Sequence, residues 1–210
     1  MTTLLQCFRL THRAGTKPLF DKLDLTINSG DRIGLVGHNG SGKSTLFSLL
    51  SGAEPPEAGE IARAGDLMLE TVEQFIDPGL RGHTLADALA AKLPVEERAF
   101  SEYKVAMLLA RLGFVEREFE HRVGDLSGGQ QNRLMFARAV INSPNLILFD
   151  EPTNHLDLRT LLYFEDFLRG MAAAYILISH DRQFLDAVTD RTLFLRDQHI
   201  LSFQLPYSEA

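Results

Sequence analysis

The sequence predicts an α/β fold in which a mainly parallel sheet is interrupted by a helical insertion. Strand-like and helix-like segments alternate after residue 19 and again after Pro144, a pattern typical of parallel sheets. Between them, residues 82–140 show mostly helical periodicity. A hydrophobic content of 45% in 210 residues is enough for a sizeable core.

Residues 19–36 predict two strands joined by a turn. Apolar and polar residues alternate at first, with the apolar positions at Leu23, Leu25 and Ile27. A turn is expected at residues 29–30, and residues 33–36 are then almost continuously apolar. The first strand should therefore be half exposed and the second buried.

Four helices are expected next. The first runs from Lys43 to Gly52, and the Pro and Gly residues of 52–60 indicate a loop after it. The second places apolar residues at helical spacing and stops at Pro94; these residues are Leu85, Leu89 and Leu93. The third spans 100–114 and ends near Gly113. The fourth begins at Ser127, a favourable N-cap, and places on one side Leu134, Ala137 and Ile141.

The alternation of strands and helices resumes after Pro144. The expected order is strand 145–150, helix 158–170, strand 174–179, helix 182–188 and a final strand pair within 191–203. The helical insertion thus lies inside one sheet-forming unit, and all 210 residues are interpreted as a single domain.

Composition and charge argue against several classes of protein. A net charge of -7 disfavours nonspecific nucleic-acid binding by the whole domain, although a local basic face remains compatible with it. No apolar run approaches the length of a membrane span, and the N-terminus lacks signal-peptide features, so a cytoplasmic location is expected. Cys7 is the only cysteine, which excludes a disulfide framework and predicts a small buried hydrophobe.

The stretch "GHNGSGKST" predicts a phosphate-binding loop. It fits the pattern G-x-x-x-x-G-K-[ST], follows a buried strand and begins a helix. Its residues are Gly37, His38, Asn39, Gly40, Ser41, Gly42, Lys43, Ser44 and Thr45. Backbone N–H groups would face a polyphosphate, Lys43 would reach the β and γ phosphates, and Ser44 would ligate Mg²⁺. The alternative is a glycine-rich turn with an exposed lysine.

An acidic pair, Asp150 and Glu151, follows the apolar strand "LILF". Ligands of an open parallel sheet lie beyond the carboxyl ends of its strands, which is where Asp150 falls. Asp150 is therefore a candidate magnesium ligand, and Glu151 a candidate base for the attacking water. The alternative, a simple cap for the turn at Pro152, does not explain the wholly apolar strand before it.

His180 follows the next predicted strand and should lie at the same sheet edge. There it could contact the γ-phosphate and hold the water and Glu151 in place. A single histidine at a strand end is more often structural, so both interpretations stay open until the other parts of the site are placed.

Together these motifs resemble the nucleotide-binding domain of the ATP-binding cassette (ABC) superfamily over nearly the whole chain. The segments similar to Walker A, the signature motif, Walker B, the D-loop and the switch histidine are 37–45, 126–130, 146–151, 156–157 and 180. The resemblance implies a P-loop NTPase core, an antiparallel β subdomain, a helical subdomain at about 82–140, and Mg²⁺-dependent hydrolysis of ATP to ADP and phosphate. It also implies a D-loop role for Asp157 and, by position alone, a Q-loop role for Gln74 near Mg²⁺.

The signature "LSGGQ" makes physical sense across two domains. Its residues are Leu126, Ser127, Gly128, Gly129 and Gln130. A helix start offers backbone donors and a positive dipole end to an anion. The resemblance implies that this anion is the γ-phosphate bound to a second cassette, so that ATP closes the pair and hydrolysis releases it. By itself the stretch could also be an ordinary capped helix start.

The stretches "EPTNHLD" and "ISHDRQFLD" are most similar to the ABC-F subfamily, through Asn154, His155, Arg182 and Phe184. The resemblance implies two cassettes in one chain and, in several members, action on the ribosome. Only one cassette is present, so the chain is interpreted as the first half of a longer protein or as a self-pairing one. The segment between Gln74 and the signature is also short for the arm insertion that many first cassettes carry.

Two questions remain open from the sequence. The residue that stacks on the adenine is uncertain, because no tyrosine precedes the phosphate loop; His12 and Phe8 are candidates, but either could be a core or surface residue. The alternative functions are the ATPase subunit of a membrane transporter and a nucleotide-gated module that binds ribosomes. Co-sedimentation with ribosomes, against extraction with membranes, would distinguish them.

Overall fold

The computed structural model describes residues 2–72, 76–153 and 156–210, and within it the chain divides into two compact units. The first unit comprises Met1–Thr71, Asn145–Glu151 and Met171–Ala210. The second comprises Val72–Pro144 and Pro152–Gly170. The predicted helical insertion, residues 82–140, lies within the second unit, which also takes in residues 152–170.

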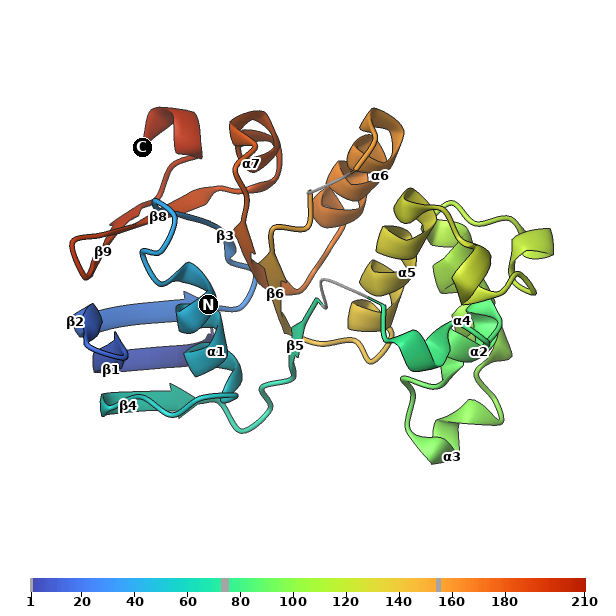
Figure 1. Ribbon diagram of the computed structural model, residues 1–210, viewed down its shortest axis with the longest axis horizontal. Helices are drawn as coiled ribbons and strands as arrows, with labels where there is room; N and C mark the ends of the chain where they lie inside the picture. The colour runs from blue at the N-terminus through green and yellow to red at the C-terminus, as the bar shows by residue number, and fades with distance from the viewer. Residues whose placement is uncertain (1, 73–75, 154–155) are drawn as a thin grey trace. The chain divides into compact units, whose positions relative to one another are not determined.

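The first unit contains a three-stranded antiparallel sheet (Figure 1). Its strands are β1 (Thr3–Ala14), β2 (Lys17–Asn28) and β4 (Ala58–Arg63), in the order β2-β1-β4. The strand predicted from residue 19 is β2. The loop predicted for 52–60 is wrong at its last three residues, which begin β4.

Gly59 explains why this end of the loop pairs as a strand. Its φ is +90°, and a Cβ there would lie 2.5 Å from the carbonyl oxygens of both Phe8 and Arg9. Only glycine allows β4 to approach β1 this closely, and a glycine within a strand often marks such an approach. The proline and glycine residues that suggested a loop therefore belong partly to a strand edge.

The first unit also contains a six-stranded sheet in the order β5-β6-β7-β3-β8-β9. Its strands are β3 (Arg32–Val36), β5 (Leu69–Thr71), β6 (Leu146–Asp150), β7 (Ala174–Ile178), β8 (Arg191–Arg196) and β9 (His199–Phe203). All neighbouring pairs are parallel except β8–β9. The predicted α/β class with a mainly parallel sheet is thus confirmed.

The register of the central strands aligns the ends that carry the predicted site. Ile178 at the end of β7 pairs with Leu35 of β3 on one side and with Asp150 of β6 on the other. The chain therefore leaves β3, β6 and β7 at one edge of the sheet. Because these strands are parallel, the three segments that follow them meet there.

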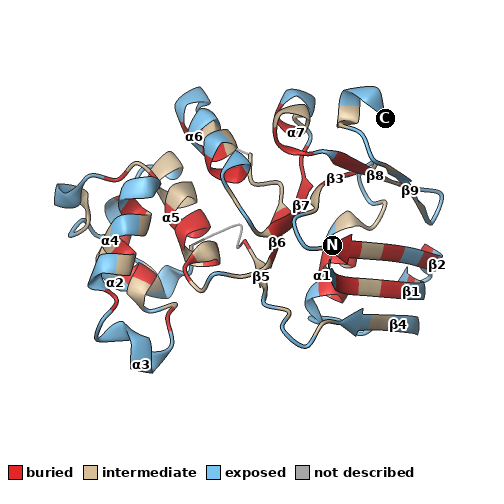
Figure 2. Cartoon of the chain, turned by 180° about the vertical axis from the view of Figure 1, so that it is seen from behind, coloured by how far each residue is buried: buried red, intermediate tan, exposed pale blue. Residues whose placement is uncertain are grey.

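The core of the first unit joins both sheets through the helix α1 (Lys43–Ser51). Leu46, Phe47, Leu49 and Leu50 of α1 share one apolar cluster with buried residues of β1, β2, β3, β6, β7 and β8, whereas β4 is mostly exposed (Figure 2). Each fully buried leucine contributes about 1.5–3 kcal/mol relative to an exposed one. Cys7 is 1% exposed within this cluster, so its prediction as a buried hydrophobe is confirmed.

The second unit contains helices and short turns of 3-10 helix. The helices are α2 (Leu85–Ala90), α3 (Val95–Arg98), α4 (Glu102–Arg111), α5 (Gly128–Val140) and α6 (Leu158–Arg169). Pro94 is the N-cap of α3, and Ser127 caps α5 as predicted. The rings of Phe136 on α5 and Phe164 on α6 stack with centroids 3.8 Å apart, which packs these two helices together.

Candidate functional site

The loop that joins β3 to α1 curls tightly around its own lysine. Gly42 adopts φ +105° before the first turn of α1, and a Cβ there would lie 3.1 Å from the buried Phe20 ring. Lys43 Nζ donates hydrogen bonds to the carbonyl oxygens of Gly37 at 2.8 Å and His38 at 3.3 Å. The glycines thus let the loop pass close to the core, and the loop surrounds the ammonium group of Lys43.

A second lysine, which the sequence did not single out, also touches this loop. Lys17, the first residue of β2, donates from its Nζ to the carbonyl oxygen of Gly40 at 2.8 Å. Lys17, His38 and Ser41 line a neighbouring cavity of about 160 Å³. No sequence signal marks Lys17, because its contact depends on how the hairpin folds over the loop.

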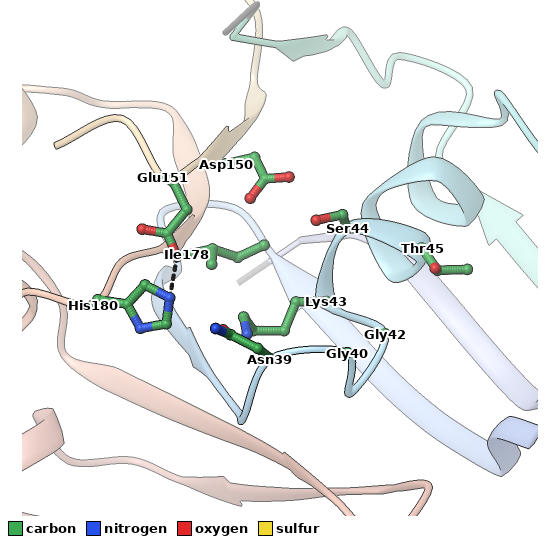
Figure 3. A pocket seen from close by; sticks show the side chains of 10 residues that line it. All are labelled: Asn39, Gly40, Gly42, Lys43, Ser44, Thr45, Asp150, Glu151, Ile178 and His180. Atoms are coloured by element: carbon green, nitrogen blue, oxygen red, sulfur yellow. Dashed lines mark ion pairs between the residues drawn. The ribbon is translucent and has the colours of Figure 1, made fainter. Parts of the chain in front are cut away.

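A pocket of about 340 Å³ brings the predicted phosphate, metal and base residues together. It is lined by Asn39, Gly40, Gly42, Lys43, Ser44, Thr45, Asp150, Glu151, Ile178 and His180. In the view of Figure 3 the Ser44 hydroxyl and the Asp150 carboxylate are drawn beside each other, above Lys43. The ends of β3, β6 and β7 supply these residues, as the sheet register requires.

Glu151 and His180 form an ion pair at the wall of this pocket (Figure 3). Glu151 Oε1 lies 3.2 Å from His180 Nε2; the glutamate side chain is 16% exposed and the histidine side chain 64%. Glu151 also adopts φ +50°, a strained value for a non-glycine residue, and its backbone N–H donates to the Ile178 carbonyl oxygen. The backbone therefore aims this side chain into the pocket.

The pKa of Glu151 is raised above its ordinary value of 4.5. Burial is the main cause, and the charge of Asp150 adds to it, while His180 and Lys43 oppose it. A carboxylate with a raised pKa binds a proton more readily, which suits a general base. The candidate role of Glu151 therefore has a geometric and an electrostatic basis.

The residues around the pocket fit Mg²⁺ and a polyphosphate. Ser44 and Asp150 offer the hard oxygen ligands that Mg²⁺ prefers, and Lys43 with the loop N–H groups suits phosphate oxygens. Among the described residues, Ser41 Oγ and Glu151 Oε2 are buried without a hydrogen-bond partner in the protein. Buried polar atoms of this kind are expected where a polar ligand completes the site.

The signature and D-loop residues belong to the second unit. Ser127 and Gly128 are exposed at the start of α5, where Ser127 Oγ accepts from the Gln130 N–H at 3.3 Å and Leu126 is buried. Asp157 caps α6 by accepting from the Thr160 N–H at 2.7 Å, and this hydrogen bond lowers the pKa of Asp157. Both helix starts thus have ordered N-caps.

Several predicted residues do not line this pocket or lie outside the described residues. Gln74, Asn154 and His155 lie outside the described residues. His12 is 4% exposed and its Nε2 lies 3.2 Å from Glu54 Oε1, which ties it into the first unit, whereas Phe8 is 43% exposed. Neither lines the pocket formed by the phosphate loop, so the structure does not place an aromatic ring for the base.

A parallel sheet that ends in this loop, with an acidic pair on the adjacent strand, defines a P-loop nucleotide-binding protein. The sequence profile of the family described as ABC transporter matches residues 20–154, more than half of the chain. The protein therefore belongs to the ABC family, and its membership supports ATP binding and hydrolysis in general.

Curated relatives agree with this assignment. The chain is 34% identical to "Probable ATP-binding protein YheS" and to "Energy-dependent translational throttle protein EttA", both of Escherichia coli strain K12. The alignments cover 93% and 95% of this chain but only 35% and 36% of those proteins, so it spans about a third of their length. Both are ABC-F proteins, which confirms the resemblance predicted from "EPTNHLD" and "ISHDRQFLD".

A solved structure supports the fold. An ABC transporter in an inward-facing conformation superimposes with a TM-score of 0.82 at 24% identity, covering 96% of this chain and 83% of that one. Within the described ranges, none of the helices is both long and apolar enough to cross a membrane.

Proposed function

We propose that this chain is an ABC-F-type cassette that binds Mg-ATP and hydrolyses it to ADP and phosphate. The observation that carries the proposal is the convergence of Lys43, Ser44, Asp150, Glu151 and His180 on one pocket. Lys43 and Ser44 begin α1 after the loop that follows β3, and the other three residues lie at or just after the ends of β6 and β7. Their side chains supply a cation that binds phosphate, two metal ligands, a base and a partner for the base.

Each residue has a role that follows from its position. Lys43 and the loop N–H groups bind phosphate oxygens, while Ser44 and Asp150 hold the metal ion. Mg²⁺ would neutralise charge that develops on the phosphates. Glu151 accepts a proton from the attacking water, and His180 orients its carboxylate through the 3.2 Å contact.

The proposal extends to closure on a second cassette, which is either another copy or a further cassette of a longer chain. At the exposed start of α5, the first backbone N–H groups of the helix, at Gly128 and Gly129, have no acceptor in a preceding helical turn. We infer that these donors bind the γ-phosphate held by the opposite cassette, so that ATP joins the pair. Asp157 is proposed to lie at the same interface, and Gln74 is proposed to lie near the metal ion.

We further propose a role in translation, with the ribosome as partner and a cytoplasmic location. The printed name of the relative EttA, a translational throttle protein, supports the role in translation. Co-sedimentation with ribosomes in the presence of ATP would test this role. Extraction with membranes instead would favour the transporter alternative.

The hydrolysis proposal is tested by phosphate release from the wild-type protein and from Glu151→Gln. We expect turnover to fall by at least about a hundredfold in the variant, since positioned proton transfer contributes about 10²–10⁴. ATP binding should persist. Glu120→Gln, an exposed site in the second unit, is the matched control and should hydrolyse ATP normally. Unchanged turnover in Glu151→Gln would remove Glu151 from the base role.

A further inference from the structure

Glu118 connects a 3-10 turn to the signature motif. Its Oε1 accepts a hydrogen bond from Gln130 Nε2 at 2.8 Å, and its Oε2 accepts from the Val115 N–H at 2.8 Å. The carboxylate thereby joins the turn Glu116–Glu118 to the first turn of α5. Both side chains are partly buried, which protects the contact from solvent.

This contact fixes which way the Gln130 amide faces. An ionised carboxylate only accepts hydrogen bonds, so Glu118 requires the NH₂ end of the amide on its side. The carbonyl end, Gln130 Oε1, is then directed at the Ser127 N–H, from which it accepts at 3.0 Å. If the amide were flipped, its NH₂ group would face the Ser127 N–H. Two hydrogen-bond donors would then meet, and the capping box would be broken.

A second contact one turn along holds the same segment against α5. Arg133 Nη1 donates to the carbonyl oxygens of Leu112 and Gly113 at 3.1 and 2.9 Å, and its guanidinium lies 4.6 Å from the centroid of the Phe114 ring. Gln130 and Arg133 are three residues apart and share one face of the helix. The segment that carries Glu118 is therefore anchored, and Glu118 can orient Gln130.

We propose that Glu118 is a positioning residue for the signature motif. Through Gln130 it holds the Ser127 backbone in its cap, which leaves the Ser127 hydroxyl hydrogen free to point outward, toward a phosphate. Ser127 Oγ is already used as an acceptor by the Gln130 N–H, so the remaining donor is the part that an anion can use. The inference rests on the proposed closure across two cassettes.

The first test measures the position of Ser127 in the protein without nucleotide. Hydrogen exchange of the Ser127 amide should be at least about tenfold faster in Glu118→Ala than in the wild type, because a charge-assisted contact that orients its acceptor is lost. Glu120→Ala, an exposed glutamate two residues away, should leave it unchanged. Equal exchange in both variants would overturn the positioning role.

The second test measures function in the Glu151→Gln background. Glu118→Ala should bind Mg-ATP as well as the parent, because the phosphate loop is in the other compact unit. Its pairing should require about tenfold more protein, because the signature motif is no longer held in place. Glu118→Gln keeps one carbonyl oxygen that can accept from Gln130 Nε2, so this variant should recover part of the pairing. Unaltered pairing in Glu118→Ala would also contradict the role.

The two tests separate this inference from the proposed function. If the parent does not pair with Mg-ATP, closure of two copies fails, and the Ser127 exchange rate still decides whether Glu118 positions the signature. A thermal melt of each variant checks that the second unit remains folded.

Discussion

Two side chains act on the candidate site and the signature motif from distant positions in the chain. Lys17 donates to Gly40 across 23 residues, and Glu118 accepts from Gln130 across 12. Such contacts depend on how a hairpin or turn folds back, which no local pattern in the sequence encodes. Lys43, Asp150 and Glu151, by contrast, could be predicted because short motifs fix their positions relative to one strand or helix.

Lys43 gives a direct prediction for nucleotide affinity. Lys43→Ala should weaken Mg-ATP binding by at least about tenfold, because a charged hydrogen-bonding group is worth about 1.5–3 kcal/mol. Isothermal titration calorimetry measures the effect. Lys104→Ala, on α4, removes an equally positive side chain far along the chain and should bind ATP like the wild type. Retained affinity in Lys43→Ala would refute the phosphate cradle.

Glu151 gives a prediction for stability against pH. Its pKa in the folded protein is raised, mainly by burial, above the ordinary value of 4.5. As pH rises from 4.5 through the raised pKa, the unfolded state loses this proton first, so the free energy of unfolding falls. Glu151→Gln removes the titration and should be more stable than the wild type at neutral pH.

The same comparison at low pH provides the control. Well below pH 4.5 the Glu151 carboxyl is protonated in both the folded and the unfolded state, and the glutamine of the variant is always uncharged. The stability advantage of Glu151→Gln should therefore disappear there. Urea denaturation without nucleotide at both pH values measures the difference. A variant that is less stable than the wild type at neutral pH would contradict the burial argument.

At the scale of elements, the predictable ones have clean periodicity or caps, and the missed ones do not. β1 contains several register shifts and a positive φ at Arg9, which break its alternation of buried and exposed residues. β4 is an exposed edge whose Ile61 alone packs on the core, and β5 has only three residues. Their formation depends on partner strands distant in the sequence.

The caps of α2 and α5 separate stability from function. Thr84 Oγ1 and Ser127 Oγ each accept a backbone N–H at the start of a helix in the second unit. Thr84→Ala and Ser127→Ala should each lower the free energy of unfolding by about 1 kcal/mol in urea denaturation. Only Ser127→Ala should also weaken ATP-dependent pairing. Equal pairing defects in both would mean that the signature acts only through stability.

At the scale of the whole molecule, the sequence predicted the α/β class and the helical insertion, but not the extent of the helical unit. Residues 152–170 group with the helices because Phe164 stacks on Phe136 of α5. This contact joins segments on either side of β6, so periodicity along the chain could not reveal it. That the two units act together as one cassette remains part of the proposal.

The central claim is that Mg-ATP closes two cassettes through the phosphate loop of one and the signature of the other. Its most direct test is the mass in solution of Glu151→Gln with and without Mg-ATP, since this variant should keep the phosphate contacts while losing the base. We predict a monomer without nucleotide and a dimer with it. A protein that remains a monomer when saturated with Mg-ATP would contradict closure between two copies of this chain.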